Sequence, residues 1–181
     1  MREAYLKDIR RTYRKYRELA ESAIAQVRDH DLHVALDAED NSIAVVMQHV
    51  AGNLRSRFGG FLTSDGEKPD RNRDAEFENH PGLDRAGLLA VWNAAWDIVL
   101  GELDVLRADD LERTVQIRHE SFTVVEALNR SVTHTVYHVG QIVFLAKHFA
   151  GTGWTSLSIP RGRSAEYGTG TFKQDIVPDR P

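Results

Sequence analysis

Cysteine is absent from the 181 residues of this chain. Without cysteine the fold contains no disulfide, and both thiolate metal ligands and a cysteine nucleophile are excluded. Any functional site must therefore be built from other side chains, which narrows the chemistry that the chain can support.

Long apolar runs and a basic excess are also missing. No window offers the roughly 18 uninterrupted apolar residues of a membrane-spanning helix. The first residues, MREAYLKDIRRTYRK, lack the apolar core of a secretory signal. The net charge of −4 argues against general nucleic-acid binding, which needs a basic surface. We therefore expect a cytoplasmic protein that binds neither membranes nor nucleic acid.

The overall composition is typical of a soluble globular protein, with 41% hydrophobic and 28% charged residues. A chain of this length fits one hydrophobic core. We predict a single domain over residues 1–163. Residues 164–181 belong to a tail rich in glycine, proline and polar residues, and we predict a partly flexible C-terminal arm there.

Apolar residues recur at three- and four-residue steps in four segments, which is the spacing of one helical face. The predicted helices span residues 2–29, 43–64, 84–107 and 124–149. Capping signals support three of the starts: Asp40, Asn41 and Ser42 precede the second helix, Asp84 precedes the third, and Thr123 with Glu126 forms a capping-box pattern before the fourth. Gly151 and Gly153 are expected to end the last helix. The fold class predicted is all-α, most simply a four-helix bundle.

The second and third predicted helices are joined by a long stretch rich in charges, glycine and proline, with no sustained period. Compact domains seldom keep loops of this length without a use. Between residues 111 and 119, Val115 and Ile117 alternate with polar residues, and this pattern predicts a short extended stretch.

Two histidines on the fourth predicted helix, His134 and His138, are four residues apart and lie on one face about 6 Å apart along the axis. Such a pair can bind one metal ion. A third imidazole, His49, lies within the apolar stripe of the second helix and needs a partner there. Three neutral imidazoles suit zinc, nickel, copper or ferrous iron and leave coordination positions open.

The residues alone leave another interpretation open, because His-x-x-x-His pairs arise by chance in helices and His49 fits a hydrogen-bonded core histidine. The other histidines do not extend the cluster. His148 lies about 21 Å beyond His134 along the helix axis. The remaining histidines are interpreted as structural or surface residues: His30, His33, His80 and His119.

The segments HVAGNLRSRFGGFLTSDGEKPDRNRDAEF, which begins at His49, and LNRSVTHTVYHVGQI resemble the DinB-like (YfiT-like) metal-binding superfamily. The resemblance extends from about Asn41 to Arg163 and is greatest to a bacterial subgroup without an assigned activity. It implies a four-helix bundle in which His49, His134 and His138 hold a divalent metal. It also implies a homodimer.

Members of that superfamily with known activity are metal-dependent transferases or isomerases that use bacillithiol, mycothiol or glutathione. From this resemblance we expect a transferase that activates a small thiol cosubstrate on the metal. Zinc or nickel is the expected ion, with iron, copper or manganese as further possibilities. One alternative is a hydrolase that uses metal-bound hydroxide, although no carboxylate base is evident near the histidines. Another is a non-catalytic stress protein that binds metal or a small ligand.

Three further residues are candidates for orienting ligands or binding substrate. Asn53 lies one turn beyond His49, and Gln141 follows His138 by three residues; each could support the site or could simply pack between helices. Arg57, together with Arg55, Arg71 and Arg73, could bind a carboxylate or phosphate of the substrate. Salt bridges to nearby acidic residues are the competing explanation for the arginines: Asp65, Asp70, Asp74 and Glu76. Tyr137 is expected in the core or at an interface.

Overall fold

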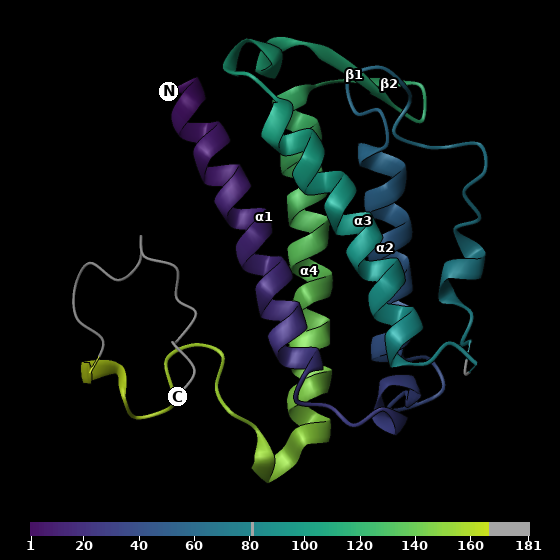
Figure 1. Cartoon of the computed structure of the whole chain (residues 1–181), viewed down its shortest axis with the longest axis vertical. Coiled ribbons are helices and arrows are strands. Elements are labelled where there is room, and N and C mark those ends of the chain that lie inside the picture. The colour runs from purple at the N-terminus through teal and green to yellow at the C-terminus, as the bar shows by residue number, and fades with distance from the viewer. Residues whose placement is uncertain (81, 167–181) are drawn as a thin grey trace.

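The computed structural model describes residues 1–80 and 82–166, and the chain is mostly helical. Four long helices stand side by side in Figure 1: α1 (Arg2–Ile24), α2 (Ile43–Phe58), α3 (Arg85–Val105) and α4 (Val124–Ala150). Five short 3-10 helices lie in the connections: η1 (His30–His33), η2 (Asp74–Phe77), η3 (Ala108–Glu112), η4 (Gly151–Gly153) and η5 (Ser164–Glu166). One hairpin joins β1 (Thr114–Ile117) to β2 (Glu120–Thr123). The prediction of a mainly α-helical fold is confirmed.

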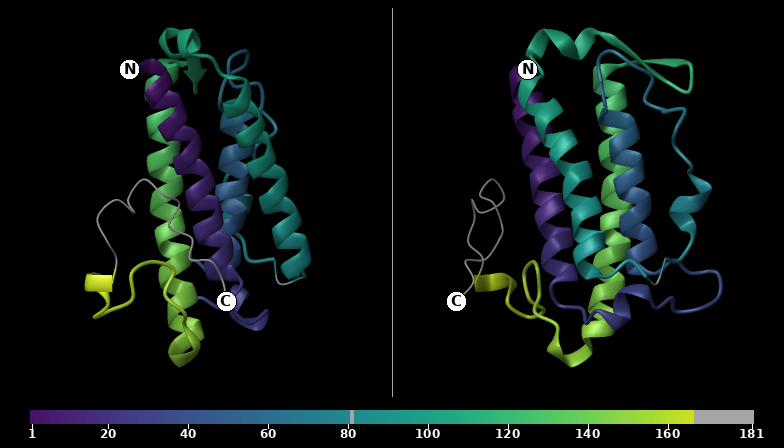
Figure 2. Two further views of the ribbon diagram at one scale, coloured as in Figure 1. Left: turned by 60° about the vertical axis from the view of Figure 1, so that its left-hand side comes forward. Right: turned by 45° about the vertical axis from the view of Figure 1, so that its right-hand side comes forward.

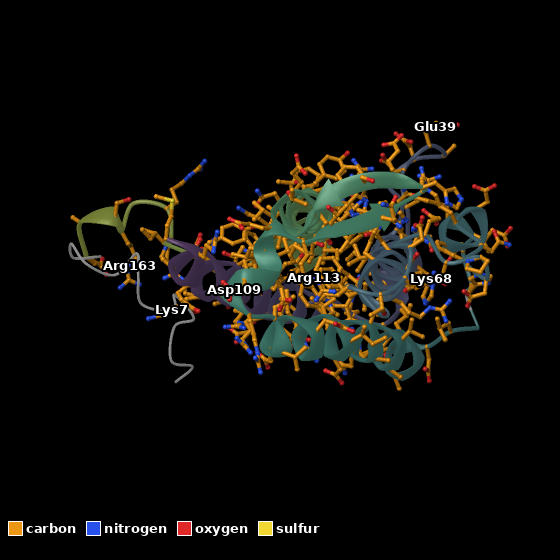
Figure 3. All side chains as sticks on the ribbon, turned by 90° about the horizontal axis from the view of Figure 1, so that it is seen from above. Lys7, Glu39, Lys68, Asp109, Arg113 and Arg163 are labelled. Carbon is orange, nitrogen blue, oxygen red and sulfur yellow. The ribbon has the colours of Figure 1, made fainter. Side chains whose placement is uncertain are left out.

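The core lies between the long helices. α2 packs against α3 and α4, and α1 packs against α4 and α3. Trp92, Trp96 and Tyr13 are fully buried, and the rings of Tyr13 and Trp96 meet edge to face with centroids 6.1 Å apart. Figure 3, viewed along the helices, shows side chains filling the space between them while the labelled Glu39 and Arg163 project at the periphery. The apolar stripes of the sequence thus face one another.

Side-chain caps fix three helix starts where the sequence predicts them. Ser42 Oγ accepts a hydrogen bond from the Val45 N–H at 3.3 Å, and Asp84 Oδ1 accepts one from the Gly87 N–H at 2.8 Å. Thr123 and Glu126 form the predicted capping box: Thr123 Oγ1 accepts from the Glu126 N–H, and Glu126 Oε2 accepts from the Thr123 N–H. These caps satisfy backbone N–H groups that have no partner inside the helix.

Two helices are shorter than predicted. α1 ends at Ile24 and not at residue 29, because the N–H groups of Gln26 and Val27 bond to carbonyls three residues back and tighten the chain into turns. α2 ends at Phe58 and not near Ser64, because Gly59 leaves the helical conformation and Gly60 takes a φ of 64°. Beyond both helix ends, buried residues still recur at the spacing of a helical face although the chain is no longer helical. The apolar pattern therefore predicted helices that were too long.

The predicted extended stretch is one half of an antiparallel hairpin, and the second strand was not predicted. Arg118 and His119 form its turn with φ values of 57° and 64°, a left-handed conformation that usually calls for glycine. Asp65 holds this turn, since its carboxylate accepts the N–H of Arg118 at 2.9 Å and of His119 at 2.8 Å. The carboxylate of Asp65, which is distant in sequence, therefore stabilises a left-handed turn that contains no glycine.

The long connection between α2 and α3 returns along the length of the helices. It must do so because α2 and α3 run in the same direction, opposite to α1 and α4 (Figure 1). The connection passes along the outer side of α2 and brings η2 into contact with that helix (Figure 2). Of the predicted C-terminal arm, residues 164–166 form η5, and residues 167–181 lie outside the described residues.

Within the part of the chain that the structure describes, α3 is the one helix long and apolar enough to span a membrane by length and composition. The core helix of a soluble protein meets the same criterion. α3 buries Trp92, Trp96 and Val99 against its neighbours.

Candidate metal centre

Three imidazoles meet between α2 and α4. The Nε2 atom of His134 lies 3.2 Å from Nε2 of His49 and 3.2 Å from Nε2 of His138. His49 is buried, and His134 and His138 are partly buried. One ligand nitrogen from each of the three residues lies within 4.8 Å of the other two. Two residues of α4 and one residue of α2, distant from them in sequence, thus direct nitrogen atoms at one point.

This spacing fits a bound metal ion. Three nitrogens at about 2.0–2.1 Å from a tetrahedral zinc ion lie about 3.3 Å from each other, close to the two 3.2 Å distances from His134. Nitrogen lone pairs that face one another at this distance repel unless a cation or a shared proton lies between them. The chemistry and the placement of the three donors therefore fit a divalent metal, and the three histidines would hold it.

The opposite nitrogens of two of these rings have hydrogen-bond acceptors. Nδ1 of His49 lies 2.9 Å from Oε2 of Glu76, and Nδ1 of His138 lies 2.7 Å from Oε1 of Gln141. Because both partners accept through oxygen, each Nδ1 carries the proton, and each Nε2 is left with its lone pair. Histidine ligands of metals usually have such partners, which fix the tautomer and the ring orientation.

Glu76 is held in place by Arg71. Nε of Arg71 donates to Oε1 of Glu76 at 2.7 Å, and Nη2 donates to Oε2 at 2.8 Å. Burial alone would raise the pKa of Glu76, but the hydrogen bonds from Arg71 and His49 hold that pKa below its usual value. A carboxylate therefore lies beside the histidines, although no local sequence pattern indicates it. Glu76 is ionised and already engaged by two partners.

A glycine on α2 makes room for this carboxylate. A Cβ atom at Gly52 would lie 2.2 Å from Oε1 of Glu76, far inside van der Waals contact. Gly52 is one helical turn from His49, so the carboxylate reaches the imidazole only by passing over a position without a side chain. The ring of Phe77, the residue after Glu76, lies over the His49 ring with centroids 4.5 Å apart.

The imidazoles of His134 and His138 are neutral at neutral pH. Burial is the main cause that lowers the pKa of His134 to about 4, and the neighbouring His138 and His49 lower it further. Burial also lowers the pKa of His138, against the opposing effect of the hydrogen bond to Gln141. Neutral imidazoles keep the lone pairs that metal binding requires.

A cavity of about 430 Å³ opens beside the cluster. Its walls include His49, Asn53 and Arg57 from α2 and Arg130, His134 and Tyr137 from α4. Two of the three clustered histidines thus face a space of the size that small-molecule sites have. A ligand in this cavity would lie directly against the candidate metal centre.

The structure separates the other candidates. Asn53 is buried and lines the cavity. Arg57 also lines it, but its guanidinium donates to Glu67 at 3.1 Å and to the Gly66 carbonyl oxygen. Arg55 pairs with Asp70 outside this cavity, as the salt-bridge interpretation predicts. Tyr137 is 64% exposed and lies at the cavity wall, so it does not pack in the core; a role at an interface stays a prediction.

The remaining histidines do not join the cluster. His148 is exposed near the far end of α4. His33 lies 3.0 Å from the carbonyl oxygen of Leu83 through Nε2 and 3.2 Å from Oδ1 of Asn79 through Nδ1, which ties η1 to the chain before α3. His119 forms the hairpin turn. These positions agree with the structural and surface roles predicted for them.

Three neighbours of the site were not predicted from the sequence: Glu76 as the partner of His49, together with Phe77 and Arg130. The first two lie in an irregular connection whose path no local pattern reveals. One signal was present: Gly52 interrupts a strongly helical segment, and an isolated helical glycine often marks a close approach of other atoms.

Fold and site together define a mainly helical protein with a candidate three-histidine metal centre. Residues 1–163 match the model of a family described as a protein of unknown function (DUF1572), and the chain belongs to that family. No curated protein matches the chain.

Proposed function

We propose that the chain is a DinB-like four-helix bundle that binds one divalent metal ion through His49, His134 and His138. The observation that carries the proposal is the convergence of three Nε2 atoms, with two Nδ1 atoms held by Glu76 and Gln141. A set of three nitrogen donors favours zinc or nickel, with iron, copper or manganese as alternatives. The predicted single domain, homodimer and cytoplasmic location remain predictions.

The function we propose is metal-dependent transfer of a small thiol to an electrophile. A C–S bond forms as a C–Cl bond or an epoxide C–O bond breaks, and the thiol proton leaves with chloride or passes to the new alkoxide. A bound divalent ion supplies Lewis acidity, which favours ionisation of a thiol. The cavity walls act in the same direction, because Arg57 and Arg71 place positive charge beside the histidines and favour an anionic thiolate. The chain has no cysteine, so the reacting sulfur belongs to the cosubstrate.

Hydrolysis has less support from the site. Among the described residues, no aspartate or glutamate lines the cavity. Glu76, the carboxylate beside His49, already accepts hydrogen bonds from Arg71 and His49 and has a lowered pKa. A general base needs a free acceptor within reach of the attacking water and a pKa near the working pH. Glu76 meets neither condition.

The test is turnover by metal-loaded protein with glutathione, mycothiol or bacillithiol and a chlorinated or epoxide acceptor. We expect thiol-dependent product formation by the wild type and by His148→Ala, whose histidine lies outside the cluster, and none by His138→Ala. No turnover above the His138→Ala variant with any thiol would contradict the transferase. Turnover without thiol would favour the hydrolase. Metal binding without any rate enhancement would favour a binding protein.

A further inference from the structure

Five arginines line the cavity beside the histidines, in a chain whose net charge is −4. They come from α2, the long connection, the hairpin turn and α4: Arg57, Arg71, Arg73, Arg118 and Arg130. No aspartate or glutamate among the described residues lines the same cavity. The cavity is therefore a cationic hollow in an acidic protein, and such a hollow attracts anions.

Two carboxylates that do not line the cavity, Glu67 and Glu76, neutralise part of this positive charge. Glu67 accepts from Arg57 at 3.1 Å and from Arg118 at 2.8 Å, and it lies 3.4 Å from Arg71. Glu76 accepts two further hydrogen bonds from Arg71, one from Nε and one from Nη2. These two carboxylates together face three arginines, so this part of the network carries excess positive charge even before Arg73 and Arg130 are counted.

Arg73 is positioned by stacking. Its guanidinium carbon lies 4.9 Å from the centre of the Phe77 ring, and that ring lies over His49. A stacked guanidinium keeps its N–H groups free around its edge, where they can donate two hydrogen bonds to a carboxylate or phosphate. The nearest carboxylate to Arg73, that of Asp74, is 4.0 Å away and is 98% exposed to solvent, which makes it a weak competitor.

Arg130 has no competitor within the described residues. It lies one helical turn before His134 on α4, so both side chains project toward the same cavity. Within residues 1–80 and 82–166, its guanidinium forms neither an ion pair nor a hydrogen bond with another residue. The wall of the same cavity also includes the buried apolar side chains of Ile117 and Ala127.

We infer that the cavity binds a small substrate through an anionic group, a carboxylate or a phosphate, held by Arg73 and Arg130. The apolar part of that molecule packs against Ile117 and Ala127, and its reacting end meets His49 and His134. The inference rests on the proposed function only for the identification of this cavity as the substrate site. The anion site itself needs no metal.

Titration calorimetry with three probes tests the inference: benzoate, phenyl phosphate and the uncharged benzamide. Each probe is titrated into metal-free and metal-loaded protein. The wild type is compared with Arg73→Gln, Arg130→Gln and the double variant. Arg55→Gln is the matched control, because Arg55 is an exposed arginine of the same region that does not line this cavity. Circular dichroism and melting temperature establish that each variant is folded.

We expect benzoate or phenyl phosphate to bind at least tenfold more tightly than benzamide. Each single substitution should weaken anion binding about tenfold, and Arg55→Gln should leave it within twofold. The anion that binds more tightly distinguishes a carboxylate from a phosphate substrate. Equal binding of benzamide, or anion binding that survives the double substitution, would overturn the inference.

The outcomes separate this inference from the proposed function. Arginine-dependent anion binding by the metal-free protein supports the inference even where elemental analysis finds no bound metal, a result that would defeat the proposed function. A metal-loaded protein that shows no arginine-dependent anion binding overturns the inference and leaves the metal centre intact.

Discussion

Oε2 of Glu76 lies 2.9 Å from Nδ1 of His49, so a carboxylate from the long connection orients an imidazole on α2. The same carboxylate accepts two hydrogen bonds from Arg71, at 2.7 Å and 2.8 Å. The connection between α2 and α3 therefore belongs to the site, and its length has a structural reason. A shorter link could not carry a carboxylate back along α2 to the histidines.

Replacing this carboxylate should weaken metal binding. In Glu76→Gln, His49 loses a charged acceptor that fixes its tautomer, and the affinity for zinc should fall about 10–100-fold. The unfolding free energy should fall by about 1–3 kcal/mol, because buried Arg71 loses its main partner. Metal titration with a competing chelator and urea denaturation measure the two effects. Glu78→Gln, at an exposed position two residues away, should change neither; an unchanged zinc affinity in Glu76→Gln would contradict the role of Glu76.

Gly52→Ala should damage the site although alanine favours helices. A Cβ there would lie 2.2 Å from Oε1 of Glu76, so the carboxylate must move away from His49. We expect weaker zinc binding and a lower melting temperature. Gly101→Ala, at a helical glycine with open space around it, should instead stabilise by about 0.5–1 kcal/mol. A stabilised Gly52→Ala with wild-type zinc affinity would show that the close contact is unimportant.

Gln141 should support His138 in the same way but more weakly. Its Oε1 accepts from Nδ1 of His138 at 2.7 Å, and a neutral acceptor contributes less than a carboxylate. Gln141→Ala should reduce zinc affinity about tenfold with little change in melting temperature. Gln48→Ala is the control, because Gln48 bonds only to the Ala44 carbonyl of its own helix in the described residues. The proposed support of His138 fails if both variants bind zinc like the wild type.

Ionised Asp65 should stabilise the folded protein at neutral pH, and this stabilisation should be lost at low pH. Hydrogen bonds from the N–H groups of Glu67, His119 and Arg118 lower the pKa of Asp65 to about 2. Because the folded-state pKa lies below the unfolded value of about 3.9, the stabilisation is complete above pH 5 and is lost as the pH falls toward 2.

Urea denaturation of wild type and Asp65→Asn across this pH range measures the effect. At pH 7 the variant should be less stable by about 1–3 kcal/mol, and the difference should shrink between pH 4 and pH 2. Asp40→Asn, at an exposed aspartate, should follow the wild type. A difference between Asp65→Asn and the wild type that stays constant with pH would show that the ionised carboxylate does not hold the hairpin turn.

Local patterns predicted the helices well because periodicity and caps are properties of neighbouring residues. Asp84 and Thr123 cap the helices that the sequence assigns to them. The predicted helix ends were wrong where the backbone leaves the helical conformation before the apolar pattern stops, as it does at Gly59. The hairpin turn was missed because its left-handed residues, Arg118 and His119, are stabilised by the distant Asp65.

The site was only partly predictable for the same reason. Helical geometry alone relates His134 to His138. His49 joined them through a family resemblance, because its approach depends on how α2 packs against α4. Glu76 comes from a segment without periodicity, 27 residues after His49, and only the folded chain brings the two together. Contacts made by irregular segments are not encoded in any local spacing.

The metal content of the purified protein tests the central claim most directly. Elemental analysis should compare the wild type, a triple variant with alanine at His49, His134 and His138, and His148→Ala, each checked for folding by circular dichroism. We predict about one divalent ion per chain in the wild type and in His148→Ala, and none in the triple variant. Equal metal content in all three proteins, or no metal in the wild type after incubation with zinc and nickel, would contradict the three-histidine metal centre.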